Sequence, residues 1–212
     1  MDRNPRIGAA RAAGFSLIEV LIAILIVVIG LLGLAGMQAR ALIGELESYQ
    51  RAQALVLLYD LVERLNNNRL TGSCFAITTD TANGAPYFGD PASPVTPSCA
   101  VDTTANNAMA VAAMTAWDGL LSGASEKKGG ATRVGAMIGA RGCISYNVGS
   151  EYVNATTGAN IGGTGEYTIA VAWQGMANTF APTASCGRNL YGSEAMRRAV
   201  WTTMRIATLR AQ

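Results

Sequence analysis

The feature that most constrains this chain is a run of apolar residues close to its N-terminus. Phe15 to Met37 holds 18 apolar residues among 23, three glycines and a single charged residue, Glu19. At about 1.5 Å per residue, a helix of this length spans ~35 Å, which is enough to cross the ~30 Å hydrocarbon core of a bilayer. The sequence therefore predicts a membrane-spanning helix at residues 15–37.

The net charge of the chain lies directly before this helix. The 212 residues carry 16 basic and 14 acidic side chains, a net charge of +2. Residues 1–14 contain Arg3, Arg6 and Arg11 against Asp2, so this segment accounts for the whole excess and the remaining chain is neutral. Because basic flanks stay on the cytoplasmic side of a membrane, we expect a cytoplasmic N-terminus and a periplasmic domain after Met37.

Composition excludes several kinds of catalytic site. The chain has no histidine, so Ser-His-Asp and Cys-His catalysis and His-ligated zinc are ruled out. The sequence has no Gly-rich phosphate loop and no Gly-x-Ser-x-Gly motif. The candidate catalytic acids are scattered along the chain, without a paired spacing: Asp80, Asp90, Asp102 and Asp118. We therefore expect no enzyme activity, no cofactor and no metal site.

Three interpretations compete for the N-terminal segment. A secretory signal has an apolar stretch of only 7–15 residues before its cleavage site, and here Ala39-Arg40-Ala41 is a weak candidate for that site. A plain signal anchor explains everything except Glu19, since a carboxylate within a membrane helix costs ~2.5–3.5 kcal/mol. The third interpretation takes Gly14 to Glu19 as one unit.

That unit, Gly14-Phe15-Ser16-Leu17-Ile18-Glu19, follows a basic leader and opens a long apolar helix. It resembles the processing site of type IV pilins and pseudopilins. The resemblance implies that residues 1–14 are a leader, which a membrane-embedded prepilin peptidase removes by cutting after Gly14. The same enzyme then methylates Phe15, and residues 15–37 stay on the mature protein as a transmembrane and assembly helix. Glu19 matches the family's buried acid, which in a filament can pair with the free amino group on Phe15 of a neighbouring subunit.

The helical pattern continues beyond the membrane. No proline occurs between Gln38 and Arg69, so we expect one helix from about Phe15 to Arg69, ending near Asn66-Asn67-Asn68. Residues 38–70 would form its amphipathic half, packed on a globular head. Two acid-first i,i+4 ion pairs are expected on it, Glu47–Arg51 and Asp60–Arg64. The predicted apolar stripe is Leu42, Leu46, Tyr49, Ala52, Val56, Tyr59, Val62 and Leu65.

Residues 71–212 are expected to form an α+β head. The pattern predicts a second helix at Asn106–Leu121, and segments 71–105 and 123–142 look like loops. Glu166–Gln174 alternates as a half-buried strand does, with Tyr167, Ile169, Val171 and Trp173 on one face. Cys143–Val148 and Arg198–Leu209 are the other strand candidates. A helix followed by loops and an antiparallel sheet is an α+β arrangement.

The four cysteines all lie in the part of the chain expected to be translocated, and an even number there indicates disulfides. Four cysteines allow three pairings. We prefer the neighbour pairs, Cys74–Cys99 and Cys143–Cys186, each expected to contribute about 3–4 kcal/mol. A zinc site of four thiolates is the rival, and the lack of a Cys-x-x-Cys spacing argues against it.

The head and the end of the long helix resemble minor pilins of the PilV type. The resemblance implies a type IV pilin-like fold and a low-abundance pilus subunit, stored in the inner membrane before it reaches the surface pilus. Such a subunit joins other minor pilins in a complex that primes pilus assembly at the tip, supporting adhesion and twitching motility. The residues that carry it are Tyr59-Asp60-Leu61, Asn68-Arg69, Gly142–Tyr146 (GCISY), Tyr167–Gly175 (YTIAVAWQG), Cys186-Gly187, Tyr191-Gly192 and Arg197-Arg198.

Two other roles remain to be weighed. A minor pseudopilin of a type II secretion system has the same kind of N-terminal processing site and apolar helix, and is the closest alternative. Nucleic-acid binding would have to use Lys127, Lys128, Arg133 and Arg141, but a neutral mature chain disfavours it. The expected partners are therefore the prepilin peptidase, other minor pilins and pilus subunits, and the inner membrane.

Overall fold

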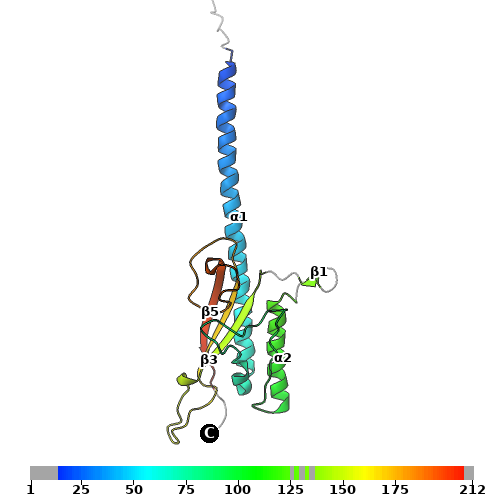
Figure 1. The fold of residues 1–212 in the computed structure, drawn as a ribbon, viewed down its shortest axis with the longest axis vertical. Coiled ribbons are helices and arrows are strands. Elements are labelled where there is room, and N and C mark those ends of the chain that lie inside the picture. Colours follow the sequence, from blue (N-terminus) through cyan, green and yellow to red (C-terminus); the bar gives the residue numbers. More distant parts are fainter. Residues whose placement is uncertain (1–13, 125–126, 129–131, 134–136, 208–212) are drawn as a thin grey trace, which may run out of the picture. The chain divides into compact units, whose positions relative to one another are not determined.

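The computed structural model describes residues 14–124, 127–128, 132–133 and 137–207 of the chain (Figure 1). The chain divides into two units, Met1–Gly44 and Glu45–Gln212. The elements in order are α1 (Leu17–Asn67), η1 (Arg69–Phe75), α2 (Thr104–Leu121), β1 (Lys127–Lys128), β2 (Thr132–Arg133), β3 (Arg141–Asn147), η2 (Val148–Ser150), β4 (Glu166–Gln174), η3 (Glu194–Met196) and β5 (Arg197–Arg205).

Helix α1 runs for 51 residues without a break. It ends at Asn67, within the predicted Asn66–Asn68 stop. An 18-residue stretch of it reaches a mean hydropathy of 3.1, so this helix is long and apolar enough to cross a membrane. Gly30, Gly33 and Gly36 lie inside the helix, and a Cβ added at any of them would meet nothing within 4 Å. The glycines therefore do not interrupt the helix.

Within the second unit, α1 packs on the head through a different face from the one predicted. Ala54, Leu58, Leu61 and Leu65 are buried, together with Gln50. Several members of the predicted stripe instead point outward, since Tyr49, Val56 and Tyr59 are 58–68% exposed. Only the last residues of that stripe were right: Leu65 is buried and Val62 packs at the edge of the core.

The reason for this error lies in the composition of the helix. Residues 54–62, ALVLLYDLV, are apolar almost all round, so three- and four-residue spacings can be found on two opposite faces. Residues 56 and 58 differ by two positions, or about 200° on a helix of 3.6 residues per turn. Periodicity alone could not decide which face meets the sheet.

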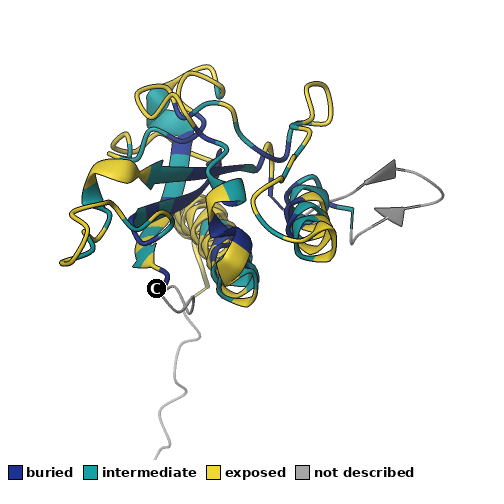
Figure 2. Ribbon diagram, turned by 90° about the horizontal axis from the view of Figure 1, so that it is seen from below, coloured by how far each residue is buried: buried dark blue, intermediate teal, exposed yellow. Residues whose placement is uncertain are grey.

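The head is built on a three-stranded antiparallel sheet in the order β3-β4-β5. The predicted alternation of β4 is confirmed, because Tyr167, Ile169, Val171 and Trp173 are all in the main core. Helices α1 and α2 contribute much of the rest of this core, with Phe75 of η1 and Phe88 of the following loop among its other members, and Figure 2 shows buried residues on the strands and on the helices. This long helix followed by an antiparallel sheet is the expected α+β, type IV pilin-like architecture.

Trp117 on α2 joins three elements of the head. The side chain is fully buried, and its indole Nε1 donates to the Leu57 carbonyl of α1 at 2.9 Å. Its ring lies against Gly142 of β3, where an added Cβ would come within 2.2 Å of Cη2. The close approach of α2 to β3 thus requires a residue without a side chain.

Two segments expected to be loops contain short elements. Strands β1 and β2 pair antiparallel, with Lys127 opposite Arg133, inside the expected 123–142 loop. The 3-10 helix η1 occupies the start of the expected 71–105 loop. The strand predicted to reach Leu209 ends at Arg205, and Leu209 lies outside the described residues.

Both disulfides join the neighbour pairs preferred from the sequence. Cys74 is bonded to Cys99 with a Cα–Cα distance of 5.2 Å, and Cys143 to Cys186 with 5.7 Å. The first joins η1, which holds Cys74, to the later part of the 71–105 segment, which holds Cys99. The second fastens the segment before β5 to strand β3.

Candidate functional site

The Gly14–Phe15 peptide bond lies in an exposed, non-helical segment. Gly14, Phe15 and Ser16 precede the helix, and the Phe15 side chain is 83% exposed. The Ser16 carbonyl accepts the first helical hydrogen bonds, from the Glu19 N–H at 3.0 Å and the Val20 N–H at 3.3 Å. A peptidase acting between Gly14 and Phe15 would therefore not have to unwind α1.

The start of α1 carries a signal that sequence reasoning missed. Ser16-Leu17-Ile18-Glu19 has the Ser-x-x-Glu spacing that is typical of helix N-termini. The helix begins at Leu17, directly after this serine and two residues after the predicted start.

Glu19 lies in the first turn of α1 and is exposed. In the part of the chain that the structure describes, no basic side chain forms an ion pair with it. Carboxylates are favoured at a helix N-terminus by the partial positive charge there. The described residues therefore leave the Glu19 carboxylate open to a partner outside them.

The helix around Glu19 is apolar on every side. All described residues from Gly14 to Gly44 are exposed within the chain, and the large apolar side chains of this stretch are 39–84% exposed. A helix that is hydrophobic all round is stable only when lipid or other helices surround it. This segment therefore needs a cover, and within its own unit the described residues do not supply one.

In the head, Glu47 of α1 binds the start of β5 and the loop before it. Its carboxylate accepts from Arg198 at 2.9 Å and from the N–H groups of Met176 and Ala177 at 3.0 and 3.3 Å. The expected Glu47–Arg51 pair is therefore wrong, because a partner 151 residues away takes the carboxylate. The expected Asp60–Arg64 pair is present at 2.6 Å.

The environment of Glu47 shifts its acidity. Partial burial acts to raise the pKa of Glu47, but the hydrogen bonds from Arg198 and the Met176 N–H, with the charge of Arg198, outweigh it. The pKa of Glu47 thus lies below the ordinary 4.5. The ionised form is the one that holds α1 to this loop.

Arg197, the neighbour of Arg198, is buried and holds the loop that returns to β5. Its guanidinium donates to the carbonyls of Pro182, Ala184 and Cys186, and Nε donates to Glu194 at 2.8 Å. The hydrogen bond from Arg197 holds the pKa of Glu194 below its ordinary value. Successive strand residues point to opposite faces, so the Arg197-Arg198 pair serves two different contacts.

The acids that were candidates for catalysis serve local structure. Asp80 accepts from the backbone of Ala82 and Asn83, and Asp118 accepts from the Gly89 N–H at 2.6 Å. Among the described residues there is no group of three or more His, Cys, Asp or Glu side chains that could hold a metal ion. Both remaining candidates are engaged as well: Asp90 pairs with Arg141 at 3.6 Å, and Asp102 accepts from Asn106 at 2.7 Å.

The candidate nucleic-acid residues are not shown to form one site. Arg141 donates to the Gly89 carbonyl at 2.8 Å and lies over the Tyr87 ring, so its charge is used within the head. Lys127, Lys128 and Arg133 lie on the β1–β2 pair.

Comparison with known proteins finds one similarity. Residues 9–35 match the family described as the prokaryotic N-terminal methylation motif, which is the signal of type IV pilins and pseudopilins. The matched segment includes Gly14, Phe15 and Glu19. No curated protein and no solved structure matches the chain.

Proposed function

We propose that this chain is a prepilin and that its mature form is a minor subunit of a type IV pilus. The observation that carries the proposal is the methylation motif at residues 9–35, placed on an exposed segment directly before an all-round apolar helix. Prepilin peptidase removes residues 1–14 and methylates Phe15. The role is structural rather than enzymatic.

The protein is proposed to occupy two environments in turn. Before assembly, residues 15–37 anchor the chain in the inner membrane, with the N-terminus in the cytoplasm and the head in the periplasm. Residues 38–70 support the head at residues 71–212. On assembly the apolar helix exchanges lipid for the helices of other pilins, which would satisfy the same exposed surface.

Glu19 is proposed to make this exchange selective. A carboxylate costs ~2.5–3.5 kcal/mol at the centre of a membrane helix. Glu19 lies in the first turn, so this value is an upper bound for it, and a partner that neutralises it favours departure from the lipid. Cleavage after Gly14 creates a free amino group on Phe15, four residues before Glu19. In packed helices, this amino group of one subunit can pair with Glu19 of the next, so processing licenses assembly.

The resemblance of the head to PilV-type minor pilins supports a place in the pilus rather than elsewhere. We propose that the subunit joins other minor pilins in a complex at the tip that primes assembly and supports adhesion and twitching motility. The residues behind this resemblance lie on β3, β4 and β5 and around the Cys143–Cys186 disulfide. A minor pseudopilin of a type II secretion system is the second candidate, favoured equally by the N-terminal motif.

The test is Glu19→Val, expressed in a strain lacking its own copy of the gene. We expect normal cleavage of the leader, because Gly14 and Phe15 are unchanged, and at least a tenfold loss of the protein from sheared surface pili. Glu19→Gln removes the charge and keeps the size of the side chain, so it shows whether the charge is what matters. Gly14→Val is expected to block cleavage and serves as the uncleaved control. Incorporation of Glu19→Val at the wild-type level would contradict the proposed role of Glu19.

A further inference from the structure

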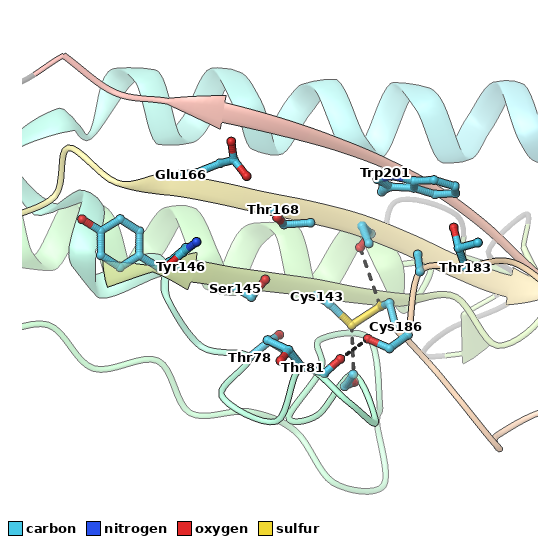
Figure 3. A pocket seen from close by; sticks show the side chains of 15 residues that line it. Thr78, Thr81, Cys143, Ser145, Tyr146, Glu166, Thr168, Thr183, Cys186 and Trp201 are labelled. Atoms are coloured by element: carbon cyan, nitrogen blue, oxygen red, sulfur yellow. Dashed lines mark hydrogen bonds between the residues drawn. A yellow bond between two sulfur atoms is a disulfide. The ribbon is translucent and has the colours of Figure 1, made fainter. Parts of the chain in front are cut away.

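The head has a groove on the face of the sheet that points away from the core. It has a volume of about 580 Å³ and is lined by β3, β4 and β5 and by two loops (Figure 3). Ligand pockets for small molecules usually measure roughly 300–1,000 Å³. The groove is therefore large enough for a ligand of more than one ring.

The strand register fixes what the floor of this groove presents. Ser145 of β3 lies opposite Thr168 of β4, which in turn lies opposite Thr203 of β5, so this row carries three hydroxyl groups. The next row along the same face comes about 7 Å further on, and in it Ala170 lies opposite Trp201 of β5. The hydroxyl row thus lies next to the row that holds the Trp201 ring. The rest of that second row is the small side chain of Ala170 and the Cys143–Cys186 disulfide.

The walls add further hydroxyl groups, of which some are already used. Thr78 Oγ1 donates to the Pro86 carbonyl and accepts from the Ile144 N–H, both at 2.9 Å. Within the described part of the chain, the hydroxyls of Ser145, Thr168 and Thr183 make no hydrogen bond. These three, on two strands and one loop, can donate to or accept from a ligand.

The charge of the lining disfavours an anionic ligand. Of the described residues that line the groove, only Glu166 is charged, and it lies at the end away from Trp201 (Figure 3). The nearest cation in the register, Arg205, is turned to other partners: it donates to the Ser150 carbonyl at 2.7 Å and lies over the Tyr152 ring. The fitting ligand is neutral and rich in hydroxyl groups.

Among the described residues, Trp201 and Tyr146 are the aromatic side chains that line the groove, and they lie at opposite ends of it (Figure 3). Trp201 is the one with the apolar surface, because the Tyr146 hydroxyl is bonded to Glu151. Trp201 is 49% exposed, whereas Trp117 and Trp173 are 0% and 3% exposed. An indole with one face open can bury the apolar face of a flat ligand while its surroundings bond the polar rim. Pyranose rings have this form, with C–H groups on their faces and hydroxyls around the edge.

We propose that this groove binds a neutral carbohydrate, with one sugar ring stacked on Trp201 and its hydroxyls bonded to Ser145, Thr168 and Thr183. The proposal goes beyond a role in the pilus and does not depend on it, since every residue involved belongs to the head.

The experiment uses the full chain, purified in a detergent whose headgroup is not a sugar. A panel of neutral oligosaccharides of hexoses and N-acetylhexosamines is titrated while tryptophan fluorescence and its quenching by acrylamide are recorded. Because Trp201 is the exposed tryptophan, we expect a saturable blue shift and reduced quenching with at least one sugar. A flat titration with the whole panel would overturn the proposal.

Variants identify the groove as the source of the signal. By calorimetry, we expect Trp201→Ala to weaken binding at least tenfold and Thr168→Val to weaken it about three- to tenfold, as for one lost hydrogen bond. Phe180→Ala removes an aromatic ring that is 99% exposed and outside the groove, so it should bind as the wild type does. Circular dichroism and melting curves check that each variant is folded.

Two further outcomes would overturn the proposal, one from the variants and one from quenching in assembled filaments. One is equal affinity in Trp201→Ala and the wild type. The other is protection of Trp201 from acrylamide in assembled filaments without any sugar, since the groove would then hold a protein neighbour.

Discussion

Glu19 and Glu47 occupy the same helix but meet opposite environments. Glu47 accepts three hydrogen bonds from the head, whereas Glu19 has no ion-pair partner in the described part of the chain. The first acid therefore serves the internal structure of one subunit. The second is available to a neighbouring subunit, which is the role proposed for it.

Glu47→Gln tests the internal role through pH. The pKa of Glu47 is lowered in the folded state, so its carboxylate stabilises the fold above about pH 4.5, and this contribution is lost as pH falls through the folded-state pKa. In urea titrations of the full chain in detergent, we expect Glu47→Gln to be less stable than the wild type at pH 7. The difference should shrink toward pH 3.

Glu63→Gln is the matched control, because Glu63 is an exposed glutamate on the same helix. It should follow the wild type at every pH. A Glu47→Gln difference that stays constant from pH 7 to pH 3 would show that the carboxylate charge is not what stabilises this contact.

Residue contacts could be predicted where they are local. Asp60 and Arg64 are one helical turn apart, and their ion pair follows from spacing. Glu47 and Arg51 have the same spacing, yet the Glu47 carboxylate accepts three hydrogen bonds from Arg198 and two backbone N–H groups instead. The Arg197 contacts were also beyond prediction, because they need the loop around Ala184 to fold back over β5.

At the scale of elements, periodicity located the helices and strands more surely than their faces. Strand β4 alternates between large apolar and small or polar residues, so the face toward the main core could be predicted; Ala170 and Ala172 on the other face are buried too, beside the Cys143–Cys186 disulfide. Helix α1 offers apolar residues on both sides at residues 54–62, and the sheet selects one of them. The choice depends on the tertiary structure, which the helical pattern does not contain.

A pair of substitutions distinguishes the two faces of α1. Leu61→Ala removes a fully buried side chain and should lower the free energy of unfolding by about 2–5 kcal/mol. Val56→Ala, on the face that the sequence favoured, alters a residue that is 68% exposed and should change stability by less than about 0.5 kcal/mol. Urea titration measures both, and similar losses would contradict the observed face.

The contact between α2 and β3 can be tested at Gly142. An added Cβ would lie 2.2 Å from the Trp117 ring, which is buried and held by its hydrogen bond to Leu57. Gly142→Ala should therefore destabilise the head by about 1–3 kcal/mol. Gly162→Ala is the control, because nothing lies within 4 Å of its added Cβ; an equally small effect of both substitutions would argue against this packing.

For the whole molecule, the division into two units could be predicted from the sequence, because the apolar run at residues 15–37 differs sharply in composition from the rest of the chain. The first unit, Met1–Gly44, has a described helix with every side chain exposed, whereas the second, Glu45–Gln212, has its own core and both disulfides. The fold class followed from this contrast and from the strand pattern. The groove did not, because its lining comes together only through the register of three strands and two loops.

The central claim is that the chain is cut between Gly14 and Phe15 and then built into a surface filament. Intact-mass analysis of the protein in sheared surface filaments tests it most directly. We predict a species that begins at Phe15 and carries one added methyl group. A species that begins near Leu42, as cleavage after Ala41 would give, or the absence of the protein from filaments, would contradict the claim.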